Sequence, residues 1–133
     1  MKALLEVVCV ALGGALGASL RYGVARGALA LWPGHRLSLP MSTLAVNVAG
    51  CLMVGLVLPV LLAREHAGGT HHVRLFVVVG LLGALTTFST FGAETLAFWR
   101  DGKPAVALAS VALHLLLGLM AVAAGAWLGQ RWA

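Results

Sequence analysis

The sequence predicts an all-α membrane protein with four transmembrane helices. Of its 133 residues, 61% are hydrophobic and only 10% are charged, which is unlike an ordinary soluble domain. A helix needs about 20 apolar residues to cross a bilayer, and four stretches reach that length. They cover approximately residues 3–30, 37–63, 73–98 and 105–129. Because these spans use nearly the whole chain, we expect a single transmembrane domain, residues 1–133, in the cell (inner) membrane.

The first span, residues 3–30, carries small residues at helical spacing. Gly13 and Gly17 lie four residues apart, and so do Gly14 and Ala18, which permits close approach of a neighbouring helix. Arg21 follows one turn later, and it either extends to the membrane interface or lines a vestibule that attracts anions. Lys2 before an apolar region is also typical of a signal peptide. The region is long and Gly-rich and three further spans follow it, which favours a membrane helix.

The second span, residues 37–63, is an uncharged helix with one polar face. Thr43, Asn47 and Gly50 recur at i, i+4 and i+7, so they share one side of the helix. An asparagine inside a membrane helix needs hydrogen-bond partners. Either it holds helices together, or its amide N–H groups are donors to a passing anion. The sequence leaves both readings open.

The third span, residues 73–98, is too long and too polar for a straight membrane helix. At 1.5 Å per residue it would extend about 39 Å, against a hydrocarbon core of roughly 30 Å. Residues 86–91 read Thr-Thr-Phe-Ser-Thr-Phe, and lipid cannot hydrogen-bond their hydroxyls. We therefore expect the helix to be broken mid-membrane, near residues 83–90, as in helices that line a cavity or an ion path.

A broken helix frees backbone groups that can bind ions. Freed carbonyls suit a small hard cation such as Na⁺, whereas freed N–H groups and hydroxyls suit an anion. Phe88 and Phe91 flank Ser89 and Thr90, and the positive edge of a phenyl ring can face an anion. The alternative is that both rings simply pack in lipid or in the core, and the neighbouring hydroxyls weigh against it.

The fourth span, residues 105–129, has a polar stripe in which Ser110, His114 and Gly118 share a face. A histidine in an apolar membrane helix needs a partner or water. Proton transfer through it would need a second deep ionisable residue, which the sequence does not offer. Cys9 and Cys51 lie in apolar segments without metal-type spacing, so we interpret them as small hydrophobic residues.

The basic residues are divided equally between the two ends of the predicted spans. One end has Lys2, Arg64, Arg74 and Arg131, and the other has Arg26, Arg36, Arg100 and Lys103, with Arg21 assigned to neither. The positive-inside rule therefore assigns no orientation. We expect the chain to insert in both directions and to pair as an antiparallel homodimer. Because the basic residues flank membrane spans, they indicate the lipid bilayer as partner and not nucleic acid. Residues 64–72 read as an exposed polar loop.

Three segments make the sequence similar to the CrcB/Fluc fluoride channels. They are residues 14–18 with Arg21 and Tyr22, residues 43–50, and residues 83–91 with Glu94. The third segment is highly specific, and the chain length and the number of spans also agree. The resemblance implies a dual-topology homodimer with two antiparallel pores, which exports fluoride passively and selectively and so relieves fluoride toxicity.

The resemblance also implies roles for individual residues. It implies a fluoride pore lined by Thr43, Asn47, Phe88, Ser89, Thr90 and Phe91, with Ser110 and His114 at the fourth-span positions. It further implies a vestibule near Arg21 and Glu94, and a structural Na⁺ at the dimer centre on the backbone carbonyls of Gly83 and Thr86. The family commonly has Tyr and then Ser where this chain has Ser110 and His114. A histidine there would make conduction depend on pH, since histidine changes charge between about pH 5 and 8.

Two other functions fit a small four-span protein with balanced charge. A dual-topology multidrug/proton antiporter needs a carboxylate deep in the membrane, but Glu6 and Glu94 lie near span ends. A structural helper subunit would use the polar cluster only to hold helices together. No nucleophile, base and orienting group fall together in the sequence, so it does not predict an enzyme.

Overall fold

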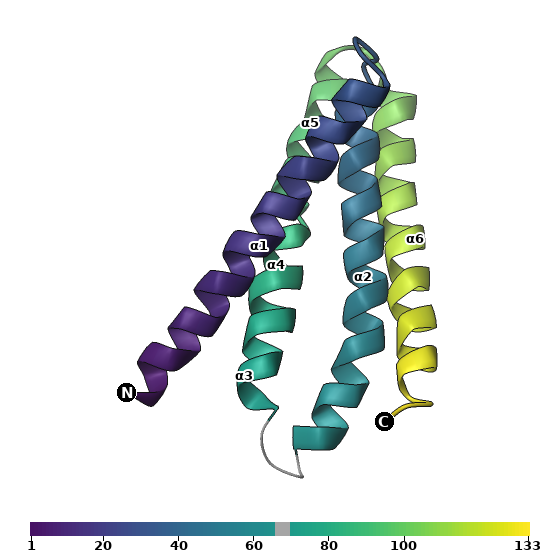
Figure 1. Ribbon diagram of the computed structural model, residues 1–133. Coiled ribbons are helices and arrows are strands. Elements are labelled where there is room, and N and C mark those ends of the chain that lie inside the picture. The colour runs from purple at the N-terminus through teal and green to yellow at the C-terminus, as the bar shows by residue number, and fades with distance from the viewer. Residues whose placement is uncertain (66–69) are drawn as a thin grey trace.

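The computed structural model describes residues 1–65 and 70–133, and in that part of the chain it contains helices and no strands (Figure 1). Its elements are α1 (Lys2–Leu31), α2 (Ser38–Glu65), α3 (His71–Arg74), the π-helix η1 (Leu75–Leu82), α4 (Gly83–Leu85), α5 (Phe88–Arg100) and α6 (Pro104–Gly129). The four segments long and apolar enough to cross a membrane are Lys2–Leu31, Ser38–Arg64, His71–Arg100 and Pro104–Gly129. The predicted all-α class with four membrane-spanning helices is therefore confirmed. Residues 66–69 of the expected polar loop lie outside the described part.

The four segments run alternately up and down, so both chain termini lie at the same end of the molecule (Figure 1). α2 and α6 lie side by side over most of their lengths. α1 packs mainly on η1 and α4, and its N-terminal half diverges from α2. The bundle thus has two tightly packed pairs, α2 with α6 and α1 with η1 and α4.

Glycines set the close approach within each pair. A Cβ added to Gly13 would lie 2.9 Å from the Leu81 amide nitrogen, and one added to Gly17 would lie 3.0 Å from that of Leu85. Real Cβ atoms avoid such distances, so only glycine lets α1 reach the backbone of η1 and α4. The sequence-based prediction of close packing is confirmed at Gly13 and Gly17 but is wrong at Gly14, because nothing lies within 4 Å of a Cβ added there. The same device joins α2 and α6, where Gly125 lies against the backbone of Leu52 and Leu56.

Gly125→Leu is expected to separate α2 from α6 and to destabilise the protein by about 3 kcal/mol, the upper range for overpacking. The side chain would collide with the Leu52 carbonyl, and backbone cannot move aside as a side chain can. Thermal unfolding in detergent measures the effect. Gly27→Leu is the matched control, because nothing lies within 4 Å of a Cβ added there. Equal stability of the two variants would contradict the prediction.

The wide π-helix η1 was not expected from the sequence. It runs from Leu75 to Leu82 and places Gly80 directly against α1, where an added Cβ would lie 2.7 Å from the Val10 carbonyl oxygen. Hydrophobic periodicity does not distinguish i→i+5 from i→i+4 bonding over eight residues of almost uniform apolar character. π-Helical turns are often found at functional sites.

The third helical segment is interrupted at Thr86 and Thr87, within the region 83–90 that the sequence singled out. Thr86 has φ −80° and ψ 154°, and Thr87 has φ −150° and ψ 111°, so both are extended. The hydroxyls supply the local reason, since threonine side chains compete with helical backbone bonding. Thr86 Oγ1 donates to the Leu82 carbonyl at 3.0 Å, and Thr87 Oγ1 accepts from the Thr90 amide at 3.2 Å as the N-cap of α5.

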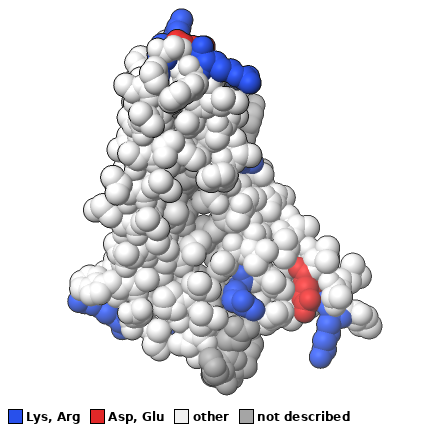
Figure 2. Space-filling view, turned by 180° about the vertical axis from the view of Figure 1, so that it is seen from behind, with Lys and Arg blue, Asp and Glu red and all other residues white. Residues whose placement is uncertain are grey.

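Charged residues gather at the two ends of the molecule. Figure 2 shows Lys and Arg at the top and at the bottom of one face, with an almost uncharged surface between them. Such a distribution suits a protein whose middle lies in lipid, since charges at depth are costly. The interruption at Thr86 and Thr87 lies near the middle of the His71–Arg100 segment.

Candidate functional site

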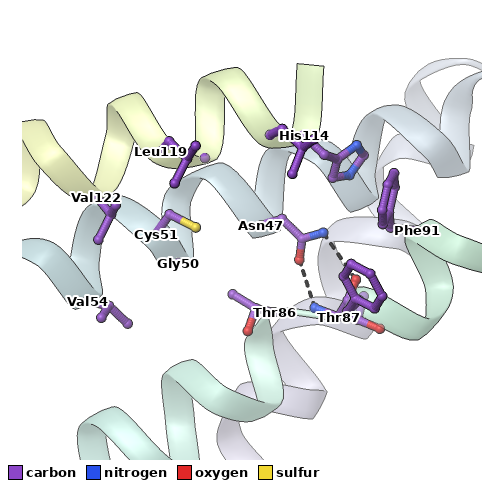
Figure 3. A pocket seen from close by; sticks show the side chains of 13 residues that line it. Asn47, Gly50, Cys51, Val54, Thr86, Thr87, Phe91, His114, Leu119 and Val122 are labelled. Carbon is purple, nitrogen blue, oxygen red and sulfur yellow. Dashed lines mark hydrogen bonds between the residues drawn. The ribbon is translucent and has the colours of Figure 1, made fainter. Parts of the chain in front are cut away.

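A groove of about 400 Å³ opens beside the interruption, between α2, α6 and the start of α5 (Figure 3). Its lining is mostly apolar, with a few polar side chains close to the interruption. The lining residues are Asn47, Gly50, Cys51, Val54, Thr86, Thr87, Phe88, Phe91, His114, Leu115, Gly118, Leu119 and Val122. We call this cavity the first groove.

Asn47 on α2 holds the interruption in place. Its Nδ2 donates to the Thr87 carbonyl oxygen at 3.1 Å, and its Oδ1 accepts from the Thr87 amide at 2.7 Å (Figure 3). These two bonds join residues 40 positions apart in the chain. Of the two roles that the sequence left open for Asn47, the structure supports holding helical segments together. Since Asn47 also lines the first groove, donation to an anion stays a prediction.

Thr87 is the centre of a small hydroxyl cluster. Thr87 Oγ1 donates to Thr90 Oγ1 at 3.0 Å and lies 3.3 Å from Ser89 Oγ. Thr87 is buried and Thr90 is half-buried, whereas Ser89 is exposed. Ser89 lines neither the first groove nor the two further grooves described below. The cluster therefore presents hydroxyl groups that can donate to an anion and that are already hydrogen-bonded to one another.

Phe88 and Phe91 form a ring pair at the mouth of the first groove. Their centroids are 5.4 Å apart at 63°, an edge-on arrangement. Phe88 is 81% exposed, whereas Phe91 is 8% exposed and contacts His114, with ring centroids 4.3 Å apart at 34°. Both phenylalanines also line a third groove of about 610 Å³, which continues along α5 past Thr95 to Trp99. The ring pair therefore separates two open spaces.

Only one of the two ring nitrogens of His114, on α6, has a hydrogen-bond partner among the described residues. Its Nδ1 lies 2.9 Å from the Ser110 carbonyl oxygen, four residues earlier. Its Nε2 is buried and has no hydrogen-bond partner among the described residues. Leaving a buried polar atom unpaired costs about 1–3 kcal/mol. Ser110 takes part through its carbonyl and does not line any of the three grooves. His114 and Ser110 are thus adjacent, but only His114 faces the first groove.

A second groove of about 350 Å³ lies on the other side of the interruption, and Arg21, Thr43 and Glu94 line it. Thr43 Oγ1 lies 2.9 Å from Glu94 Oε1 and donates to it. Thr87 and Thr90 line this groove too, and Thr87 also lines the first groove. The expected vestibule residues are therefore brought together next to the hydroxyl cluster, in a space that has both a cation and a carboxylate.

The interruption also changes the bonding of the expected Na⁺ ligands. In a continuous helix the Gly83 and Thr86 carbonyls would accept from the amides of Thr87 and Thr90. Those two amides instead donate to Asn47 Oδ1 and Thr87 Oγ1. Backbone oxygens released in this way are hard, uncharged ligands of the kind that binds a small cation.

Thr87 lies at the centre of the candidate site, although sequence reasoning assigned it no role of its own. It bonds Asn47, Ser89 and Thr90 and lines two grooves. A signal was present, because Thr87 precedes Thr90 by three residues, the spacing of an N-cap side chain and the amide that it accepts from. That spacing predicts a helix start at Phe88, inside the apolar run.

Known proteins resemble this chain over nearly its whole length. Residues 8–126 match the family described as CrcB-like protein, Camphor Resistance (CrcB). A protein of Paracoccus denitrificans named fluoride-specific ion channel FluC is 48% identical over 121 residues, which is 91% of both chains. A protein of the same name from Hydrogenovibrio crunogenus is 38% identical over 127 residues, which is 96% of this chain and 92% of the relative. Another from Salinibacter ruber is 40% identical over 123 residues, which is 92% of this chain and 88% of the relative. With four helices able to span a bilayer, this is a multi-pass membrane protein that belongs to the CrcB-like family.

Proposed function

We propose that this protein is a fluoride channel that lets F⁻ leave the cell passively and so relieves fluoride toxicity. The observation that carries the proposal is the joining of three features at one point: the interrupted helix, the hydroxyl cluster and the Phe88–Phe91 pair. Three relatives that cover most of the chain bear the name fluoride-specific ion channel.

The chemistry of the grooves suits a small, strongly hydrated anion. Water around the ion must be replaced by several weak donors, because one strong ligand would trap the ion and conduction requires release. The first groove offers the Asn47 amide, threonine hydroxyls and ring edges, and none of its lining residues is Lys or Arg. The ion loses water in steps, and no permanently charged side chain in the lining holds it.

The ion path runs from the second groove to the ring pair. Arg21 attracts F⁻ to the vestibule, and Glu94, which accepts from Thr43, offsets that charge so that the anion is not retained there. Thr87 lines both the vestibule and the first groove, so its hydroxyl passes the ion between them. Phe88 and Phe91 then present their ring edges to the fluoride ion. With the interruption near the middle of its segment, this transfer occurs at mid-depth in the bilayer.

The functional unit is an antiparallel homodimer with two pores. Phe88 is 81% exposed in the protomer, and none of the three grooves is an enclosed cavity. A pore needs a closed wall, and a second copy supplies it. The equal division of basic residues between the two ends favours insertion in both directions, so the second copy is inverted. A C-terminal tag found on only one side of the membrane would contradict this arrangement.

A structural Na⁺ at the dimer centre fits the residues present. The Gly83 and Thr86 carbonyls, released from helical bonding, would hold it together with the same atoms of the inverted copy. The ion would supply a fixed positive charge that lets carbonyl dipoles face each other across the interface.

Replacing Na⁺ with a large organic cation is expected to weaken the dimer and to abolish most fluoride flux. Loss of a ligand present at about 100 times its dissociation constant costs about 2.7 kcal/mol of assembly stability. Cross-linking yield and fluoride flux should fall together, at constant ionic strength, and recover when Na⁺ is restored. Unchanged assembly in sodium-free buffer would rule out the ion as a structural element.

Fluoride-electrode efflux from vesicles that contain the purified protein tests the function. A potassium ionophore should release F⁻ rapidly without any proton gradient, and chloride efflux should stay at the level of protein-free vesicles. Exchange of a cationic drug for protons would identify the protein as a multidrug antiporter instead. The absence of any flux would leave it a structural subunit.

A further inference from the structure

The protonation state of His114 follows from its hydrogen bond. A carbonyl oxygen can only accept, so Nδ1, which lies 2.9 Å from the Ser110 carbonyl oxygen, carries a proton. In the neutral ring Nε2 is then a bare acceptor. That nitrogen is buried and has no partner among the described residues, and its ring lines the first groove beside Asn47 and Phe91. An acceptor at this place repels an anion in the groove.

Adding a proton to the ring reverses that interaction. Protonated His114 has a donor at each nitrogen, and the buried Nε2–H would have no acceptor among the described residues. A fluoride ion is the missing acceptor, and hydrogen bonds between two charged groups are the stronger kind. The Phe91 ring, with its centroid 4.3 Å away and tilted by 34°, offers part of its negative face to the cation.

The groups around His114 permit it to gain a proton. On α5, the Glu94 carboxylate interacts electrostatically with it. On α2, the groups that line the groove with it are the neutral Asn47 amide and the Cys51 thiol. Within α6 no other residue from Pro104 to Gly129 is ionisable. Arg21 lies in the second groove together with Glu94, on the far side of Thr87.

We propose that protonated His114 is a fluoride ligand in this chain, donating from Nε2 to the ion beside the Phe88–Phe91 pair, so that proton binding and fluoride binding reinforce each other. The proposal rests on the fluoride-channel function and adds a residue-specific dependence on pH. The proton comes from solution and returns to it when the ion leaves, and the ring stays bonded to Ser110 throughout.

Proton uptake on fluoride binding is the direct test. Adding NaF to the purified protein in weak buffer near pH 7 should consume protons, because the ion favours the charged ring, and linkage makes the effect reciprocal. His114→Ser should abolish the uptake, and so should His114→Gln, whose neutral amide holds the same space. His72→Gln is the control, since His72 is exposed on α3 and lines none of the three grooves. Equal proton uptake by the His114 variants and the unmodified protein would overturn the proposal.

Flux measurements supply the second readout. At fluoride concentrations below saturation, efflux should be about tenfold faster at the acidic than at the basic end of the range in which histidine titrates, about pH 5 to 8. The HF leak of protein-free vesicles is subtracted at each pH. His114→Gln should conduct with little pH dependence. If that variant keeps the profile and Glu94→Gln loses it, Glu94 is the sensor and the proposal fails. No flux at any pH would instead contradict the channel function itself.

Discussion

Replacing either ring of the pair, by Phe88→Ile or Phe91→Ile, is expected to lower fluoride flux by about tenfold, while the dimer stays assembled. A ring edge is worth up to roughly 1.5 kcal/mol beyond its buried area, which corresponds to about a tenfold change in rate. Isoleucine keeps the apolar character but has no positive edge to face an anion. Fluoride-electrode efflux, with cross-linking to count dimers, measures the effect.

The two substitutions should differ in their effect on stability. Phe88 is 81% exposed in the protomer, whereas Phe91 is 8% exposed and packs on His114, so Phe91→Ile should also destabilise the fold by about 1 kcal/mol. Phe98→Ile is the matched control, because Phe98 is 9% exposed, lies on the same helix α5 and lines none of the three grooves. It should lose stability and keep its flux. Unchanged flux in both Phe88 and Phe91 variants would remove the rings from the mechanism.

Asn47→Ala is expected to lower flux about 100-fold, equivalent to a barrier about 3 kcal/mol higher. The substitution removes both bonds to the Thr87 backbone and leaves its N–H and carbonyl without their side-chain partner. Each unsatisfied group costs about 1–3 kcal/mol, so the turn that presents Thr87 to both grooves should lose its geometry. Flux and thermal unfolding are measured on the same preparation, and the flux loss should exceed what the unfolded fraction explains.

Ser38→Ala is the matched control for Asn47. Ser38 is 1% exposed, its hydroxyl lies 2.8 Å and 2.7 Å from the carbonyl oxygens of Trp32 and His35, and it lines none of the three grooves. It should lose comparable stability with normal flux per folded dimer. Asn47→Asp adds a second comparison, since it keeps the acceptor for the Thr87 amide but places a negative charge in the groove. If Asn47→Ala lost flux only in proportion to unfolding, as Ser38→Ala would, Asn47 would be a structural residue alone.

The helices could be predicted from the sequence because lipid imposes a simple requirement on length and composition. The expected spans 37–63 and 105–129 lie within one or two residues of Ser38–Arg64 and Pro104–Gly129. The same requirement made the hydroxyls of residues 86–91 conspicuous, and the chain leaves helical geometry at Thr86 and Thr87. The π-helix escaped prediction, since Leu75–Leu82 is apolar at nearly every position and shows no period that would distinguish one helix type from another.

The sequence by itself determined that this protein has four segments able to cross a membrane, that its third helix cannot stay regular, and which side chains share a helical face. Only the tertiary structure decided what those side chains bond to. In the folded protein both the nitrogen and the oxygen of the Asn47 side-chain amide hydrogen-bond to the Thr87 backbone. Phe91 packs against His114, and the Ser110 side chain lies outside the three grooves. Helical periodicity fixes a direction around one axis, whereas a hydrogen-bond partner depends on how two axes pack, and here glycine contacts between the helices set that packing.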